Sequence, residues 1–150
     1  MTLEAPLDSD GERSWRALMR VVVALPKALD DDLLKATGLT LSEYTVLMRL
    51  SEADGGELRI GDLASSTALS LSRISRMVNS PQARGRVGKR RHDHDARGWA
   101  TSLTDEGLRR PESAYPALLL SARRRVVDHV HCDAAAMTVH QIRRIASVLE

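Results

Sequence analysis

Apolar side chains recur every three or four residues along most of the chain, which is the spacing of helices that bury one face. The first stripe predicts a long helix from about Glu12 to Lys35, and Gly38 is expected to break the chain after it. Pro26 lies inside this span and is expected to kink the helix, because it removes a backbone donor and crowds the preceding turn. The apolar positions of the stripe are Trp15, Leu18, Met19, Val22, Leu25, Leu29 and Leu33.

Three shorter helices are predicted next. Ser42 is expected to cap a helix from Glu43 to Ala53, which a turn at residues 54–56 terminates. A short helix covers about residues 61–67, and Ser70 is a good cap for a fourth helix, from Leu71 to about Arg84. The positions expected to face inward are Val46, Leu47, Leu50, Leu63, Ala64, Ile74, Met77 and Val78.

A polar hairpin and two further helices complete the predicted order of elements. Gly85 suits the left-handed residue that ends the fourth helix. Residues 87–91 and 99–103 are predicted as two short strands, joined by a polar loop over 92–98. Thr104 then opens a helix that is expected to be bent or interrupted by Pro111 and Pro116 before the apolar run 118–130, and a last helix spans about 134–149.

Charge is distributed unevenly along the chain, although the net charge is only +2. Residues 1–58 carry a net charge of −5, residues 59–97 carry +6, and residues 98–150 carry +1. A basic block inside an otherwise acidic protein favours a segment that binds a polyanion. The alternative explanation of this basic block is a solvated face that only aids solubility. Asp30-Asp31-Asp32 is interpreted as a solvated acidic run.

The order of helix, short helix, tight break, capped helix and polar hairpin is that of a winged helix-turn-helix. A helix fits the major groove of duplex DNA, and its N-terminal residues reach base edges. Arg73 and Arg76 share one helix face, so either could bind guanine or hold a phosphate, whereas a solvated face is the alternative. The candidate DNA-binding residues are Ser70, Ser72, Arg73, Ser75 and Arg76 on the helix and Lys89, Arg90, Arg91 and Arg97 on the hairpin.

From about Ser14 to Leu149 the sequence resembles the MarR (multiple antibiotic resistance regulator) family of transcription factors. The segments that carry the resemblance are GLTLSEYTVL (38–47), LASST (63–67), LSLSRISRMV (69–78), ARGRV (83–87), DARG (95–98) and LTDEG (103–107). The sequence departs from the family at Pro81, where a long apolar residue is expected, and we expect the helix to end or bend near Asn79. Arg86 and Gly88 also weaken the usual apolar start of the first wing strand.

The resemblance implies a single domain with two functional parts. Residues 39–104 would form the winged helix-turn-helix, and about 12–38 and 105–150 would be dimerisation helices of a homodimer that binds a palindromic operator in double-stranded DNA. In that family the wing arginine, here Arg97, enters the minor groove, and the wing aspartate, here Asp95, orients basic side chains. The family often binds small aromatic or phenolic effectors, for which the candidates by position are Trp15, Met19, Tyr44, Met48 and Arg49.

The apolar stripes outside the winged region agree with a dimer, because those flanking helices cannot bury their faces alone. We therefore expect a mainly α fold with a small two-stranded β wing, and a dimeric regulator that acts as a repressor. The alternative is a winged-helix interaction module that no longer reads DNA sequence, which the three prolines at 81, 111 and 116 and the acidic N-terminal third favour.

Other chemistry has weaker support in the sequence. The histidines and aspartates at 92–95 are interpreted as a polar wing rather than as metal ligands. Cys132 is interpreted as a small, half-buried residue at a helix junction. The open alternatives are a regulatory zinc site formed by Asp128, His129, His131 and Cys132, and a redox role for Cys132. No phosphate loop or nucleophile elbow is present, so we expect neither an enzyme nor a cofactor. One cysteine, an acidic N-terminus and no long apolar run favour a cytoplasmic protein without a membrane span.

Overall fold

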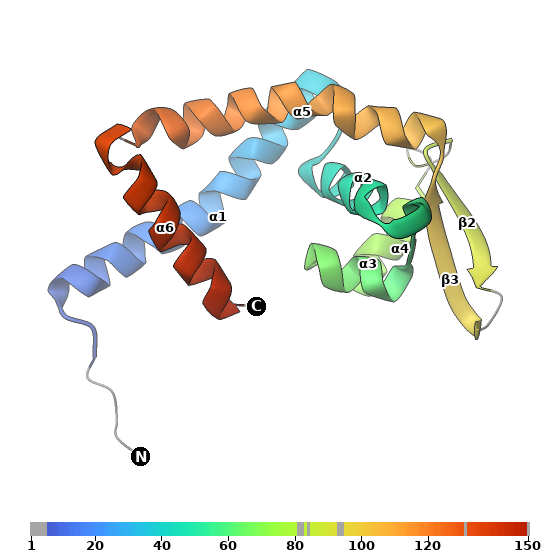
Figure 1. Cartoon of the computed structure of the whole chain (residues 1–150), viewed down its shortest axis with the longest axis horizontal. Helices are drawn as coiled ribbons and strands as arrows, with labels where there is room; N and C mark the ends of the chain where they lie inside the picture. Colours follow the sequence, from blue (N-terminus) through green and yellow to red (C-terminus); the bar gives the residue numbers. More distant parts are fainter. Residues whose placement is uncertain (1–5, 81–82, 84, 93–94, 131, 150) are drawn as a thin grey trace, which may run out of the picture.

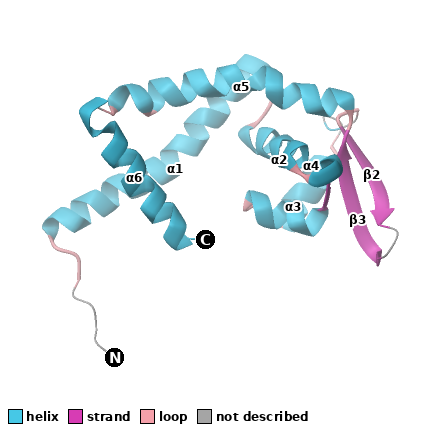
Figure 2. Ribbon diagram, viewed as in Figure 1, coloured by secondary structure: helices cyan, strands magenta, loops and turns pink. Residues whose placement is uncertain are grey.

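The computed structural model describes residues 6–80, 83, 85–92, 95–130 and 132–149 of the chain. Its long helix α5 joins an arm, made by α1 and α6, to a winged unit that contains α2, α3, α4 and a small sheet (Figure 1). The described part is mainly helical (Figure 2), as the sequence predicts. The elements in chain order are α1 (Ser9–Thr37), α2 (Leu41–Glu52), η1 (Asp54–Gly56), β1 (Glu57–Arg59), α3 (Ile60–Thr67), α4 (Leu71–Val78), β2 (Val87–His92), β3 (Asp95–Leu103), α5 (Asp105–Arg125), η3 (Val127–His129) and α6 (Cys132–Leu149).

Helix α1 is longer than predicted and continues through Pro26. Asp8 caps its first turn, where the carboxylate accepts a hydrogen bond from the Gly11 amide at 2.7 Å. Gly38 ends it with a φ of 71°, a left-handed conformation that glycine adopts at little cost. The proline removes one backbone donor without interrupting the helix.

The cap of α2 is Thr40, so the prediction of Ser42 is wrong. The Thr40 hydroxyl accepts from the Glu43 amide at 3.2 Å, and the Glu43 carboxylate accepts from the Thr40 amide at 2.9 Å. This reciprocal capping box satisfies two backbone donors at once, which the cap at Ser42 would not have done. Ser42 lies instead in the first turn of α2.

Helix α4 ends at Val78, well before the predicted Arg84. Ser70 caps it as expected, since its hydroxyl accepts from the Arg73 amide at 3.3 Å. A proline at 81 disfavours helical geometry at Ser80, which explains an end near Asn79. Pro81 itself lies outside the described residues. Gly85 is left-handed with a φ of 83°, but α4 has already ended at Val78, so this glycine does not end the helix.

The sheet has three strands in the order β1-β3-β2, all antiparallel, and not the two that the sequence predicts. β1 is only three residues long and pairs Leu58 with Thr101, so its pattern was too short to be recognised. The hairpin strands also extend into the predicted loop, because β2 reaches His92 and β3 begins at Asp95.

Helix α5 is continuous from Asp105 to Arg125, so the predicted interruption at its prolines is wrong. Pro111 is fully buried, and Ala114 packs in a core that α1 and α2 share. This packing outweighs the loss of two backbone donors. The helix also ends earlier than the apolar run that extends to Val130, since a short 3-10 turn, η3, follows it. Thr104 caps it as predicted, with its hydroxyl accepting from the Gly107 amide at 3.1 Å.

Two buried clusters lie on two different faces of α2. One consists of Val46, Leu50, Leu63, Ala64, Ile74 and Val78 and holds the winged unit together. The other consists of Leu33, Leu39, Tyr44, Leu47 and Ala114 and fastens that unit to α1 and α5. Val87 and Leu103 pack against both clusters, so the base of the hairpin is tied to both.

Two acidic side chains of the Asp30-Asp31-Asp32 run are structural, so the interpretation as a wholly solvated run is wrong. Asp30 accepts a hydrogen bond from the Leu41 amide at 2.6 Å and so joins α1 to the start of α2. Asp32 binds side chains of α5. In the part of the chain that the structure describes, no helix has both the length and the apolar character to cross a bilayer.

Candidate nucleic-acid interface

The leading end of α4 is exposed, as a helix that enters a DNA groove must be. Ser70, Ser72, Arg73 and Arg76 are exposed and Ser75 is half-buried, whereas Ile74 and Val78 on the opposite face are buried. The hydroxyls of Ser70 and Ser72 lie 3.2 Å apart and share a hydrogen bond. The first turn of α4 therefore presents a small, ordered polar surface.

The Arg73 guanidinium reaches from α4 to the N-terminal turn of α2. Its terminal nitrogen donates to the Ser42 hydroxyl at 2.9 Å. An open groove of about 680 Å³ lies at this junction, lined by Leu34, Gly38, Thr40, Ser42, Glu43, Arg73, Arg76, Met77 and Ser80. Sequence reasoning missed the role of Ser42, because 31 residues separate it from Arg73 and no local pattern connects them.

Arg76 lies one turn further along α4 and is exposed on the same groove. It makes no hydrogen bond or ion pair with other residues whose positions the structure describes. Among the described residues, none occupies the donors of this guanidinium, whereas that of Arg73 is already held at one nitrogen. The two arginines that the sequence could not tell apart are therefore in different environments.

The hairpin of β2 and β3 stands beside α2 and α3, which contact β3 (Figure 1). Its backbone pairs Lys89 with Thr101 and Arg90 with Ala100 in antiparallel register. The side chains of the remaining candidates, Lys89, Arg90, Arg91, Asp95 and Arg97, lie outside the described residues. Their strands place them on the hairpin, and their contribution to binding stays a prediction.

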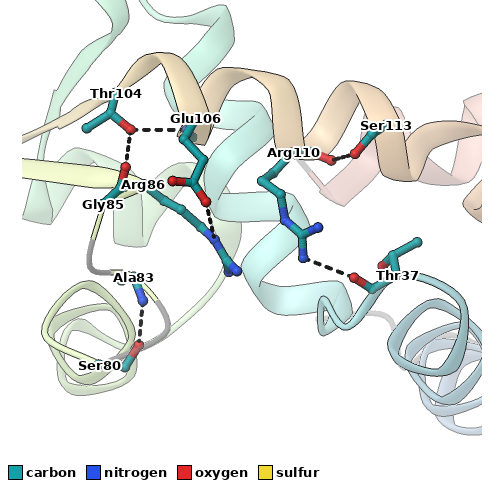
Figure 3. Close-up of polar contacts among 10 residues, drawn as sticks. Thr37, Ser80, Ala83, Gly85, Arg86, Thr104, Glu106, Arg110 and Ser113 are labelled. Atoms are coloured by element: carbon teal, nitrogen blue, oxygen red, sulfur yellow. Dashed lines mark hydrogen bonds and ion pairs between the residues drawn. The ribbon is translucent and has the colours of Figure 1, made fainter.

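The base of the hairpin is fastened to the first turns of α5 (Figure 3). The Thr104 hydroxyl donates to the Gly85 carbonyl at 2.5 Å, and the Glu106 carboxylate lies 4.0 Å from the Arg86 guanidinium. One turn later, Arg110 donates to the Thr37 carbonyl at 3.0 Å. These contacts join the loop before β2, the end of α1 and α5 into one unit, so the hairpin is positioned by the arm as well as by its own core.

The five candidate effector residues form two separate groups in one chain. Trp15 and Met19 are 52% and 38% exposed on the first half of α1. Tyr44 and Met48 belong to the cluster between α1, α2 and α5, and Arg49 pairs with Glu52 at 3.0 Å on the surface of α2. Trp15 lies 18 residues before Leu33 of that cluster, which corresponds to about 27 Å along a helix. Burial raises the pKa of the Tyr44 phenol.

Potential metal and redox residues at the junction of α5 and α6 are only partly among the described residues. Within the described residues, no three histidine, cysteine, aspartate or glutamate side chains converge as metal ligands would. Asp128 instead accepts from Arg123 at 3.1 Å. His131 lies outside the described residues, as does the side chain of Cys132.

Comparisons with known proteins point to one family of DNA-binding regulators. Residues 37–98 match the family model described as MarR family. AbsC, a MarR family transcriptional regulator from Streptomyces coelicolor, is 29% identical with a TM-score of 0.79, and the match covers 97% of each chain. Sco3205 from the same organism, solved in complex with DNA, is 25% identical with a TM-score of 0.84, covering 100% of this chain and 94% of that one. The regulator BldR from Sulfolobus solfataricus has the same fold at 18% identity, with a TM-score of 0.75 and coverage of 94% and 99%. No curated protein matches the sequence.

Proposed function

Because residues 37–98 match the MarR family model and solved MarR family regulators share the fold, we propose that the chain is a MarR family member, a cytoplasmic, homodimeric transcriptional regulator that binds a palindromic site in duplex DNA and acts as a repressor. The observation that carries the proposal is the exposed, hydroxyl- and arginine-rich leading end of α4, and the basic sequence of the hairpin in the same winged unit supports it. The structure of Sco3205 with DNA supports it, since that regulator has the same fold over nearly its whole length.

In this proposal the two arginines of α4 have different roles. Arg76, whose donors are unengaged within the described residues, reaches into the major groove and binds a base edge, where a bidentate contact to guanine is the favoured geometry. Arg73, held by Ser42 at the N-terminal turn of α2, binds a backbone phosphate through its remaining guanidinium donors. The hairpin, with Lys89, Arg90, Arg91 and Arg97, binds adjacent phosphates and the minor groove.

Dimerisation is supported by apolar side chains that a single chain leaves exposed. Helix α6 is exposed over residues 139–148, where its side chains are described, and carries a stripe of Val139, Ile142, Ile145 and Val148, which are 49–84% exposed. Val21, Val22 and Val23 of α1 are 51–70% exposed. Soluble monomers rarely expose contiguous apolar faces of this size, so a second chain that packs its own α1 and α6 against them would remove them from water.

A small aromatic or phenolic effector would release the dimer from DNA. The two groups of candidate residues are far apart in one chain, so a site that uses both groups requires the second chain of the dimer. Such an effector shifts DNA affinity only by the difference between its affinities for the DNA-binding and non-binding forms.

The proposal is tested by selecting bound sequences from a random duplex pool and measuring affinity for the selected site over a series of salt concentrations. We expect enrichment of a palindrome and an affinity that falls steeply with salt, because bound arginines release counterions from phosphates. Arg76→Ala should cost about 1–3 kcal/mol and relax preference at one position, whereas Arg73→Ala and Arg97→Ala should weaken binding to all sequences with a shallower salt slope.

Arg13→Ala is the matched control, because it removes one exposed positive charge on α1, far along the chain from α4. It should leave both affinity and salt slope unchanged. No preference over random duplex at moderate salt would instead favour the interaction module. Unchanged binding by all three arginine variants would refute the assignment of residues.

A further inference from the structure

One apolar side chain in the winged unit is exposed where the rest of that unit is polar. Among the side chains that the structure describes, the exposed large hydrophobic residues lie on α1, α5, η3, α6 or just before α1, with the single exception of Leu71. Leu71 is the first residue of α4 and is 60% exposed. It is therefore separate from the apolar faces that the second chain is proposed to cover.

The polar neighbours of Leu71 are already engaged with one another. The Ser70 hydroxyl caps the helix and shares a hydrogen bond with Ser72, and Arg73 is bound to Ser42. The next apolar residue, Ile74, is fully buried in the core. At the tip of α4, Leu71 is thus the side chain that projects without a polar partner and without a place in the core.

The major-groove edges of the four base pairs differ in one apolar feature, the C5 methyl group of thymine. Residues at the N-terminal end of a recognition helix are those that meet base edges. We propose that Leu71 is a specificity-determining residue that packs on the C5 methyl group of one thymine in each half-site of the operator. This inference rests on the proposed DNA-binding function. It names the base that the first turn of α4 selects.

The magnitude of the effect follows from the surface removed from water. Burial of one methyl group contributes about as much as one buried CH₂, so loss of that methyl weakens binding about fourfold per half-site. Loss in both half-sites of a symmetric operator weakens binding about fifteenfold when the two sites act independently. The contact carries no charge, so it leaves the salt dependence of binding unchanged.

The test uses the full-length protein and an operator selected from a random pool. Each thymine is replaced in turn by deoxyuridine, which removes the methyl group and keeps every hydrogen-bonding group. For the parent protein we expect one thymine per half-site at which the replacement weakens binding about fourfold. In Leu71→Ala the thymine and deoxyuridine operators should bind within about twofold of each other, whereas Leu71→Met, which remains apolar and long, should keep the discrimination.

The outcomes separate this inference from the function on which it rests. If no sequence is enriched and binding shows no preference, the proposed function fails and the inference fails with it. If the parent binds its operator with a steep salt dependence but tolerates deoxyuridine at every thymine, the inference alone is overturned. It is also overturned if Leu71→Ala loses as much affinity on deoxyuridine replacement as the parent does.

Discussion

At the scale of single residues, the carboxylate of Asp32 joins the arm to the long helix. It accepts hydrogen bonds from Arg125 at 2.8 and 3.0 Å and from the buried Ser121 at 2.5 Å. An ion pair and a neighbouring hydrogen bond therefore hold α1 and α5 together. The Arg125 hydrogen bonds, and then that of Ser121, hold the pKa of the Asp32 carboxyl well below its usual range. The same contact raises the pKa of Arg125.

This contact predicts how stability depends on pH. The pKa of Asp32 is lower in the folded protein, so its contribution to stability is present above the unfolded carboxyl pKa of about 3.9 and is lost as pH falls through the folded value. We expect Asp32→Asn to be less stable than the parent at pH 7, with the gap narrowing below about pH 4.

Urea unfolding followed by circular dichroism from pH 7 to pH 2 measures this difference. Asp31→Asn, at the exposed neighbouring position, is the matched control and should follow the parent curve. Parallel curves for the parent and Asp32→Asn would show that the contact contributes nothing to folding.

Residues that act through distant partners were the hardest to predict from the sequence. The exposed faces and caps of α4 follow from local periodicity, and Ser70, Ile74 and Val78 lie as predicted. The roles of Asp32 and Ser42 depend on partners 89–93 and 31 residues away, which no local pattern encodes. Thr40 was overlooked as a cap because Ser42 also has a capping hydroxyl, and only the backbone geometry decides between them.

At the scale of elements, the first turn of α5 lies against the loop that leads into the hairpin. The Arg86 carbonyl accepts a hydrogen bond from the Thr104 amide at 3.0 Å, and Gly107 is buried directly above this carbonyl. A Cβ atom at Gly107 would lie 2.0 Å from the Arg86 oxygen, which is closer than two nonbonded heavy atoms can approach. Glycine at this position lets the base of the wing and the helix approach each other.

We therefore expect Gly107→Ala to lower the free energy of unfolding by about 1–3 kcal/mol, because either the loop or the helix must move. The gain in helix propensity from glycine to alanine, up to about 1 kcal/mol, is included in this range. Thermal unfolding at fixed protein concentration measures the effect, and hairpin displacement should also weaken DNA binding.

Gly61→Ala in α3 is the matched control, since a Cβ atom there would meet no atom within 4 Å. This variant should be as stable as the parent or slightly more stable. Equal stability of the two alanine variants would contradict the close approach of α5 to the wing base.

Long helices were predictable from the sequence, whereas a short strand and a helix that depends on tertiary packing were not. The stripes of α1 and α2 identified those helices, and the polar hairpin was recognised from its two strands. The inward positions of α2 are buried as predicted, whereas Leu33 is the one residue of the α1 stripe that the chain buries fully. β1 spans three residues and forms only because β3 offers it a free edge. The continuity of α5 through Pro111 and Pro116 depends on burial against α1 and α2, which overrides the local preference of proline.

At the scale of the whole molecule, the arm of a single chain leaves apolar side chains exposed to solvent. Along α6, Ile142 lies on the same face as Val139 and Ile145, and this face is exposed to solvent. The sequence indicated such faces through its apolar stripes, but it could not show which of them the chain buries by itself. The winged unit has a core of its own, whereas the described part of α6 has none.

The dimer proposal predicts a specific effect of charge on that face. Ile142→Glu should shift the protein toward a single chain of 16.5 kDa at micromolar concentration, because an unpaired carboxylate in an apolar interface is strongly unfavourable. Light scattering after gel filtration measures the mass, and affinity for a palindrome should fall with it.

Ser147→Glu adds the same charge on the opposite face of α6 and is the matched control. It should keep the mass of the parent. A parent protein that is already a single chain at these concentrations would remove the basis for the two-fold arrangement.

The single span of α5 from the wing base to the arm also makes the molecule act as a lever (Figure 1). Its 21 residues form a rod of about 32 Å. A tilt of about 10° at the arm end would swing the wing end through about 5–6 Å, which exceeds the rise of about 3.4 Å between successive base pairs. In the proposed dimer, a tilt of this size would be sufficient to move α4 out of register with its half-site.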